Sequence, residues 1–225
     1  MIFQLTKRFT VFANVLLGAA GLVLQTPAMA RASCALDTIG IATNLANASF
    51  SPFLGHAVGE TFFAKDTLIA KVTVWRPNNN TSVIGAHLFI TAVDTTLSPP
   101  RPTTQTILLN GPTAHVYDST PPGQLIEMPF VIDPPLALPG PGYYAWFLQA
   151  EDCNQGEAWI IAASDTNPYP RGITWITGRA GLVCYLASVE GGQDNLDLIF
   201  RIEFCGSAVT PVQQQTWGRL KAIYR

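Results

Sequence analysis

Charged residues are scarce in this chain, and neither sign of charge is in clear excess. They make up 12% of the 225 residues, about half the share in an average soluble protein, and the formal net charge is −2. Because there is no basic surplus to neutralise phosphates, the composition argues against a nucleic-acid partner. The 48% share of hydrophobic residues also excludes an intrinsically disordered chain. The composition therefore predicts a folded protein that does not bind nucleic acid.

The sequence also lacks the short motifs that mark common catalytic sites. It contains no G-x-S-x-G elbow, no H-E-x-x-H zinc motif and no phosphate-binding glycine loop. His56, His87 and His115 lie far apart and belong to no paired motif. Glu151 and Asp152 are neighbours, so an extended chain points them to opposite faces, which favours a solvated loop over a glycosidase pair. We therefore predict a non-enzymatic protein.

Metal-ligand patterns are absent as well. Zinc sites use closely spaced cysteines or cysteine–histidine clusters, and the four cysteines of this chain are far apart. Asp194 and Asp197 lie beside the glycine-containing run 190–193, where calcium could bind, but that run has no defined ligand pattern. No cofactor is predicted, and calcium at these two aspartates stays open as the alternative.

The first thirty residues have the layout of a secretory signal peptide. Lys7 and Arg8 precede a mostly apolar run from Phe9 to Leu24, and Ala28-Met29-Ala30 offers small residues for cleavage. A membrane anchor is the alternative, but the run is short for a bilayer, which needs roughly 20 residues. A lipoprotein signal is disfavoured because Arg31 stands three residues before Cys34. We expect cleavage after Ala30, a secreted or cell-surface location and no transmembrane span in the mature chain.

The cysteines agree with export. All four lie after the signal segment, and an even number in an exported chain predicts two disulfides with three possible connectivities. The expected pairs are Cys34–Cys205, which would tie the first strand to the last, and Cys153–Cys184. Each bridge would stabilise the fold by about 2–4 kcal/mol.

The remaining sequence reads as short strands separated by proline, glycine and asparagine clusters. In the clearest strand, Leu196 to Phe204, every second residue from Leu196 is apolar, which predicts one buried and one mostly wet face. Leu68 to Trp75 repeats the pattern with Trp75 facing outward. The fold class that follows is all-β, an antiparallel jelly-roll-like sandwich of roughly ten short strands over residues 31–205.

Three segments resemble bacterial secreted β-sandwich modules of the kind called choice-of-anchor domains. The segments are Val58–Val74, Pro134–Tyr143 and Tyr169–Arg201, whose motifs are similar to G-x-x-F-x-A…L-x-x-V, P-L-x-L-x-x-G-x-Y and Y-P-G-G…W…D-L-A-F-R. The sequence departs from the family where Arg171 replaces a glycine and where the glycine pair before the tryptophan is missing. The resemblance implies an exported sandwich, and it brings no established activity and no functional residues.

Aromatic residues give the best lead to a ligand. Trp75 and Trp175 fall near strand ends or at outward positions, and Tyr169 lies in the loop before Trp175. Aromatic faces on a rigid sandwich can stack on sugar rings. The alternative is that these rings pack in the core, as most tryptophans do. We name Trp75, Tyr169 and Trp175 as ligand candidates, with a polysaccharide or another cell-surface component as the partner.

Residues 206–225 form a separate unit, a linker followed by a short amphipathic helix. Thr216 could cap it, and Trp217, Leu220 and Tyr224 would share one face at helical spacing. A helix of about ten residues is marginal alone in water, so it would need a partner surface. The segment resembles T-W-G-x-x-K-x-x-Y-R tails of bacterial exported proteins, which implies sorting or docking; a frayed terminus packed on the sandwich is the alternative.

Three functions follow as hypotheses. The first is a non-enzymatic exported sandwich for surface association or recognition. The second is a carbohydrate-binding module that uses surface aromatics, and the third is a jelly-roll hydrolase. A hydrolase requires two carboxylates, or a nucleophile and a base, that converge in one cleft.

Overall fold

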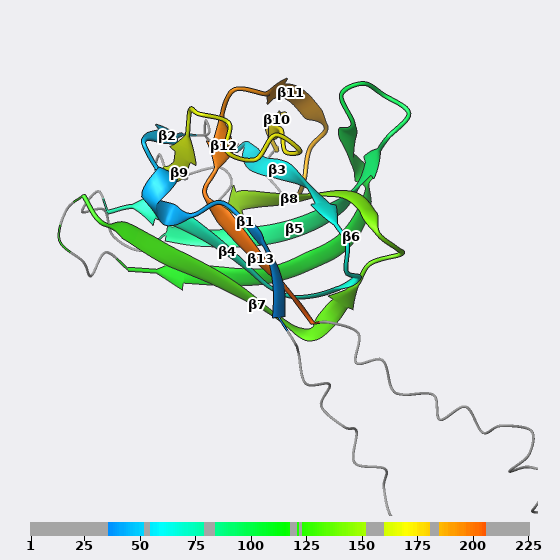
Figure 1. Ribbon diagram of the computed structural model, residues 1–225, viewed down its shortest axis with the longest axis horizontal. Coiled ribbons are helices and arrows are strands. Elements are labelled where there is room, and N and C mark those ends of the chain that lie inside the picture. Colours follow the sequence, from blue (N-terminus) through cyan, green and yellow to red (C-terminus); the bar gives the residue numbers. More distant parts are fainter. Residues whose placement is uncertain are drawn as a thin grey trace, which may run out of the picture. The chain divides into compact units, whose positions relative to one another are not determined.

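A computed structural model describes most of the chain beyond its first segment (Figure 1). The described residues are 36–51, 55–78, 84–117, 121, 123–151, 160–180 and 185–205. By its internal contacts the chain divides into Met1–Arg31 and Ala32–Arg225, and all described residues belong to the second unit. The signal segment, the linker and helical tail, and three of the cysteines lie outside the described residues, so their structures remain predictions. These include Cys34, Cys153, Cys184, Trp217, Leu220 and Tyr224.

A four-stranded antiparallel sheet forms one layer. Its order is β1 (Leu36–Gly40), β13 (Phe200–Cys205), β4 (Leu68–Pro77) and β7 (Leu125–Ala137). β1 and β13 lie side by side in Figure 1, and Leu36 pairs with Cys205. Cys205 is disulfide-bonded, and the other three cysteines lie outside the described residues, so both expected pairings stay predictions. β7 is an edge strand that includes Pro134 and Pro135, as expected for residues that cannot donate to a central ladder.

A six-stranded antiparallel sheet forms the second layer. Its order is β11 (Val189–Gln193), β10 (Thr174–Thr177), β3 (Ala57–Ala64), β8 (Gly142–Ala150), β5 (Ile84–Asp94) and β6 (Arg101–Val116). A small third sheet has the order β12 (Asp197–Leu198), β9 (Ile161–Ser164) and β2 (Ala48–Phe50). A 3₁₀ turn at Thr43–Leu45 precedes β2.

Eight of the strands have the order of a jelly roll. The neighbours β1-β13-β4-β7 face β3-β8-β5-β6, and the chain alternates between the two sheets except at the β5–β6 hairpin. The predicted antiparallel sandwich is therefore confirmed. The unexpected part is residues 151–199, a long connection between the last two jelly-roll strands that carries β9 to β12.

Alternation along the strands builds the core between the two large sheets. Val72, Val74 and Phe130 from one layer and Phe62 and Trp146 from the other belong to the same buried cluster. A second cluster covers the outer face of the six-stranded sheet, where Phe89, Phe147 and Trp175 pack with Leu186 and Val189 of the connection. The central strands β3 and β8 of the six-stranded sheet are therefore buried on both faces.

The predicted strand Leu196 to Phe204 is wrong as a single element. The structure divides it into β12 and β13 at Ile199, whose backbone joins Ala162 on one side and Trp75 on the other. Asp197 and Ile199, expected on a wet face, are buried because the third sheet covers this end of the sandwich. Among the described residues no helix is long and apolar enough to cross a membrane.

Candidate functional site

Trp75 faces outward from β4, as predicted, but its ring is covered. The guanidinium of Arg201 lies 5.3 Å from the ring centre, and only 8% of the residue is exposed. The ring borders an open groove of about 470 Å³ beside residues 38–43. The expectation of an exposed stacking face is therefore wrong for Trp75, because a neighbouring strand supplies a side chain that closes over it.

Trp175 and Tyr169 also lack an open ring face. Trp175 is 6% exposed and packs in the second core cluster, where β11 covers it. Tyr169 is half-buried: its hydroxyl accepts the Phe63 N–H at 3.2 Å, and its ring meets Phe200 edge-on at 5.6 Å. The structure does not gather the three predicted aromatics into one platform, since Trp75 and Trp175 belong to different sheets.

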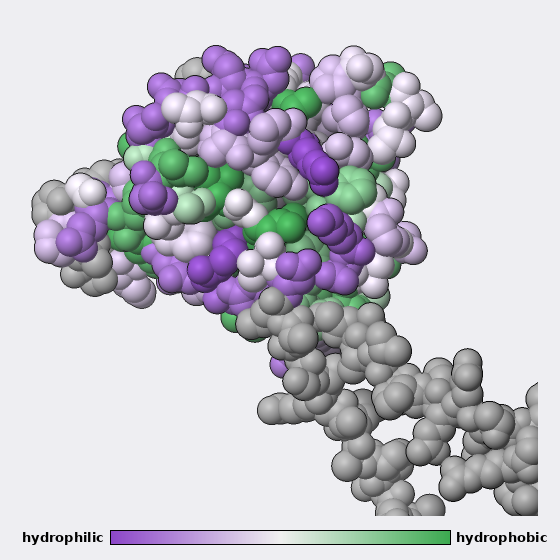
Figure 2. All heavy atoms as spheres, in the orientation of Figure 1, coloured by the Kyte–Doolittle hydropathy of each residue, from purple (hydrophilic) through white to green (hydrophobic). Residues whose placement is uncertain are grey.

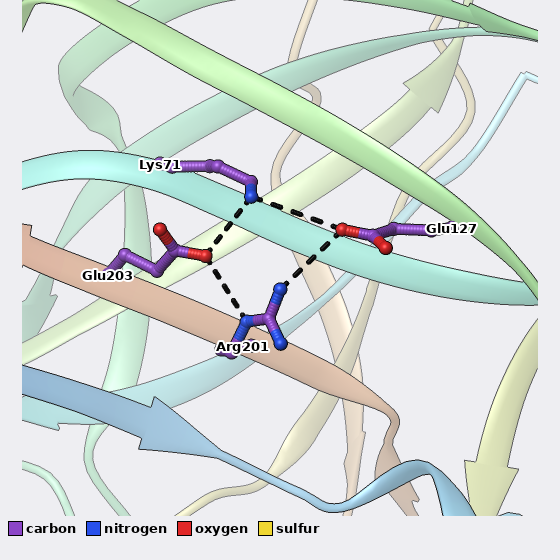
Figure 3. Close-up of polar contacts among 4 residues, drawn as sticks. All are labelled: Lys71, Glu127, Arg201 and Glu203. Atoms are coloured by element: carbon purple, nitrogen blue, oxygen red, sulfur yellow. Dashed lines mark ion pairs between the residues drawn. The ribbon is translucent and has the colours of Figure 1, made fainter.

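The outer face of the four-stranded sheet carries a charged quartet, Lys71, Glu127, Arg201 and Glu203 (Figure 3). Lys71 Nζ lies 3.1 Å from Glu203 and 3.9 Å from Glu127, while Arg201 lies 3.2 Å and 3.5 Å from the same two carboxylates. Figure 2 shows hydrophilic residues interspersed with a band of hydrophobic ones on the face in view. With two positive and two negative groups closed on each other, the quartet leaves no net charge to attract an ion.

A second concave site among the described residues lies on the outer face of the six-stranded sheet. This His87 cavity has a volume of about 230 Å³ and is bordered by His87, Phe89, Asn110, Gln149, Glu151 and Tyr185, among others. β5, β6 and β8 supply the floor, and the segment at Tyr185 supplies a wall. The cavity is near the small end of ligand sites, so it suits one small ring better than an extended chain.

His87 is held on both ring nitrogens. Nε2 lies 2.5 Å from Asn110 Oδ1, and Nδ1 lies 3.0 Å from Thr113 Oγ1. Because an amide oxygen only accepts, Nε2 carries a hydrogen, and Nδ1 can accept from the threonine hydroxyl. Phe89 meets the imidazole edge-on at 4.7 Å. The ring is thus a fixed wall with neither nitrogen directed at a ligand.

Tyr185 is the exposed aromatic residue of the cavity, at 53%. The buried Gln149 amide fixes this segment by donating to the Tyr185 carbonyl at 3.3 Å and to the Gly55 carbonyl at 3.4 Å. Glu151, beside the cavity, lies 2.6 Å from His115 Nε2. The described lining includes no lysine or arginine, so its polar groups suit a neutral, hydroxyl-bearing ligand better than an anion.

Two acidic residues do come together, but away from these cavities. Glu60 and Asp197 are 0% and 1% exposed, and neither borders the His87 cavity or the Trp75 groove. Asp194, the other candidate calcium ligand, is exposed and uses its backbone carbonyl to accept the Asn167 amide. The described residues include no cluster of three or more acidic, histidine or cysteine side chains that could hold a metal ion.

Comparisons with known proteins add no relative. No family model matches the chain, and no curated protein matches it. The likeness to choice-of-anchor modules therefore remains a prediction from the motifs quoted above.

Sequence reasoning missed the His87 cavity because its parts are distant along the chain. Asn110, Gln149 and Tyr185 meet His87 only through the register of three strands and the path of the connection. The position of Glu60 in the sequence, in contrast, did indicate an unusual buried acidic residue. It stands between Val58 and Phe62 at an inward position of an apolar strand, where an acidic side chain needs a special partner.

Proposed function

We propose that this chain is an exported, non-enzymatic β-sandwich protein for surface association or recognition, and that it binds its ligand at the His87 cavity. The arrangement of His87 carries the proposal. In a catalytic site the histidine directs a nitrogen at substrate or at a nucleophile. Here both nitrogens are occupied by side chains of β6, which makes the ring a rigid binding wall.

Carbohydrate is the ligand class that the cavity favours. The exposed Tyr185 ring can stack on a sugar face, while amide and carboxylate groups beside it can orient hydroxyls. The hydrolase alternative needs carboxylates that reach a cleft, and the Glu60–Asp197 pair is sealed from solvent. Export rests on residues 1–30, and the tail from Thr216 remains our proposed docking segment.

The test compares two tyrosine variants of the oxidised mature chain, residues 31–225. Tyr185→Ala removes the ring at the cavity, whereas Tyr117→Ala removes a ring that is 65% exposed and not among the cavity residues. Glycan arrays and polysaccharide pull-downs should show binding weakened about 2- to 10-fold by Tyr185→Ala alone, since a ring contact is worth about 0.5–1.5 kcal/mol. Trp175→Ala is unsuitable because Trp175 is buried.

Three outcomes would contradict the proposal. Equal loss in both tyrosine variants would remove the cavity as the binding site. Failure of the unmodified chain to bind any glycan or cell-envelope preparation would remove recognition as the function. Turnover of a bound polysaccharide would restore the hydrolase hypothesis.

A further inference from the structure

Glu60 and Asp197 each keep one carboxyl oxygen without a hydrogen-bond donor. Glu60 Oε2 accepts the Leu198 N–H at 2.6 Å, and Asp197 Oδ2 accepts the Tyr169 N–H at 2.7 Å. The remaining oxygens, Glu60 Oε1 and Asp197 Oδ1, are buried and have no partner. Buried acceptors of this kind are rare because leaving them unsatisfied is costly.

The Asp197 carboxyl holds the loop of residues 165–173 to the sandwich, and the loop packs against Glu60. Asp197 binds its backbone at Tyr169, and the loop passes so close to Glu60 that a Cβ added to Gly172 would lie 2.4 Å from Glu60 Oε1. Tyr169 adds a hydrogen bond to Phe63. The loop thus closes over Glu60 and excludes water from it.

No positive charge balances the pair. Neither carboxyl forms an ion pair with a described lysine, arginine or histidine, and Arg171 is placed over the Phe63 ring at 5.6 Å. Tyr169, on this loop, interacts with the charges of Glu60 and Arg171 and with the Tyr143 hydroxyl. Thr174 lies beside Glu60 but donates its hydrogen to the Leu196 carbonyl at 2.5 Å.

We infer that Glu60 and Asp197 hold one proton between them in the folded protein and that this proton keeps the 165–173 loop packed over Glu60. One proton leaves the pair with one negative charge instead of two and leaves fewer buried acceptors without a partner. Two neighbouring carboxylates that are both sealed from water cannot both ionise without a large cost.

Burial raises the pKa of Glu60 well above its usual value, and the neighbouring Asp197 charge raises it further, against hydrogen bonds that lower it. Burial also raises the pKa of Asp197. The unfolded chain would release the shared proton near the ordinary glutamate pKa of about 4.3, whereas the folded chain keeps it. The stabilisation is therefore complete below that pH and is lost as pH rises through the raised folded pKa, by up to about tenfold in the unfolding equilibrium constant per pH unit.

The test measures denaturant unfolding of residues 31–225 from about pH 5 to about pH 9, with Glu60→Gln and the exposed Glu190→Gln as matched variants. The glutamine amide is neutral at every pH of this range, so Glu60→Gln should lose this pH slope and Glu190→Gln should keep it. Amide exchange of residues 165–173, corrected for its intrinsic pH dependence, should rise at high pH in the unmodified chain and stay low in Glu60→Gln. If Glu60→Gln fails to fold, Asp197→Asn removes the second charge of the pair instead.

Infrared difference spectroscopy supplies an independent readout. The unmodified chain at neutral pH should show the carbonyl stretch of a protonated carboxylic acid, and Glu60→Gln should lose it. An unchanged pH slope in both Glu60→Gln and Asp197→Asn, or no such band in the unmodified chain, would overturn the inference. Stabilisation of the chelator-treated unmodified chain by Ca²⁺, absent in Glu60→Gln, would show that a metal ion rather than a proton joins the pair, and would also overturn it.

Discussion

The charged quartet and the Glu60–Asp197 pair neutralise carboxylates in opposite ways. In the quartet, Glu127 and Glu203 are partly exposed and each faces both Lys71 and Arg201. In the pair, the two carboxyls are buried and rely on backbone N–H groups and, as we infer, on a proton. Because the charges of the quartet are solvated and paired with one another, they contribute little to the free energy of unfolding. The buried pair has no water to solvate it, so its free energy depends on each group that surrounds it.

The largest effect should follow from filling the space beside the pair. In Gly172→Ala the new Cβ would clash with Glu60 Oε1 and lie 2.6 Å from the Tyr169 ring, so the loop or these buried side chains must shift. We expect a loss of about 2–3 kcal/mol in the free energy of unfolding, measured by denaturant titration. Gly140→Ala is the control because nothing lies within 4 Å of its Cβ position. Equal effects of the two substitutions would show that the loop is not closely packed on Glu60.

A smaller loss is expected when one polar group beside the pair is removed. Thr174→Val keeps the shape of this 1% exposed side chain but leaves the Leu196 carbonyl without its donor. The expected cost is about 1–2 kcal/mol of unfolding free energy. Thr106→Val on the exposed part of β6 should change it by less than about 0.5 kcal/mol. If Thr174→Val leaves the free energy of unfolding unchanged, this end of the sandwich tolerates a buried carbonyl without a hydrogen-bond donor.

The smallest effect belongs to the quartet. Lys71→Gln removes one cation, but Arg201 still faces both glutamates, so about 0.2–1 kcal/mol should be lost. The difference from the unmodified chain should shrink further in about 1 M salt, which screens partly exposed charges. Lys65→Gln, at an exposed position, is the matched control. A loss above about 2 kcal/mol in the free energy of unfolding, or a loss that salt does not change, would show that the quartet is as sensitive to the loss of a partner as a buried charge pair.

Period-2 alternation was enough to predict the sandwich, because it decides which residues of each jelly-roll strand enter the core. It also placed Lys71 and Trp75 correctly on the outer face of β4. It could not show what covers that face, since the Arg201 side chain comes from β13 through strand register. Whether an outward-facing aromatic ring is exposed therefore depends on side chains from neighbouring strands, and the sequence of one strand does not show which side chains these are.

The connection between β8 and β13 was the part that sequence reasoning could not resolve. Its strands are two to five residues long and pair with β2 and β3, far away in the sequence. Asp197 looked like a wet residue or a calcium ligand for that reason, although it is buried against the loop. Long-range pairing, rather than local pattern, decides burial there.

The pairing of β1 with β13 also determines how the domain responds to mechanical load. Leu36 and Cys205 are partners at the same end of an antiparallel ladder, so a pull applied between them acts along the inter-strand hydrogen bonds. The ladder would peel apart one bonded pair at a time instead of resisting as a whole in shear. If the chain were held by one terminus and loaded through the other, the predicted Cys34–Cys205 bridge would transfer that load from hydrogen bonds to a covalent bond.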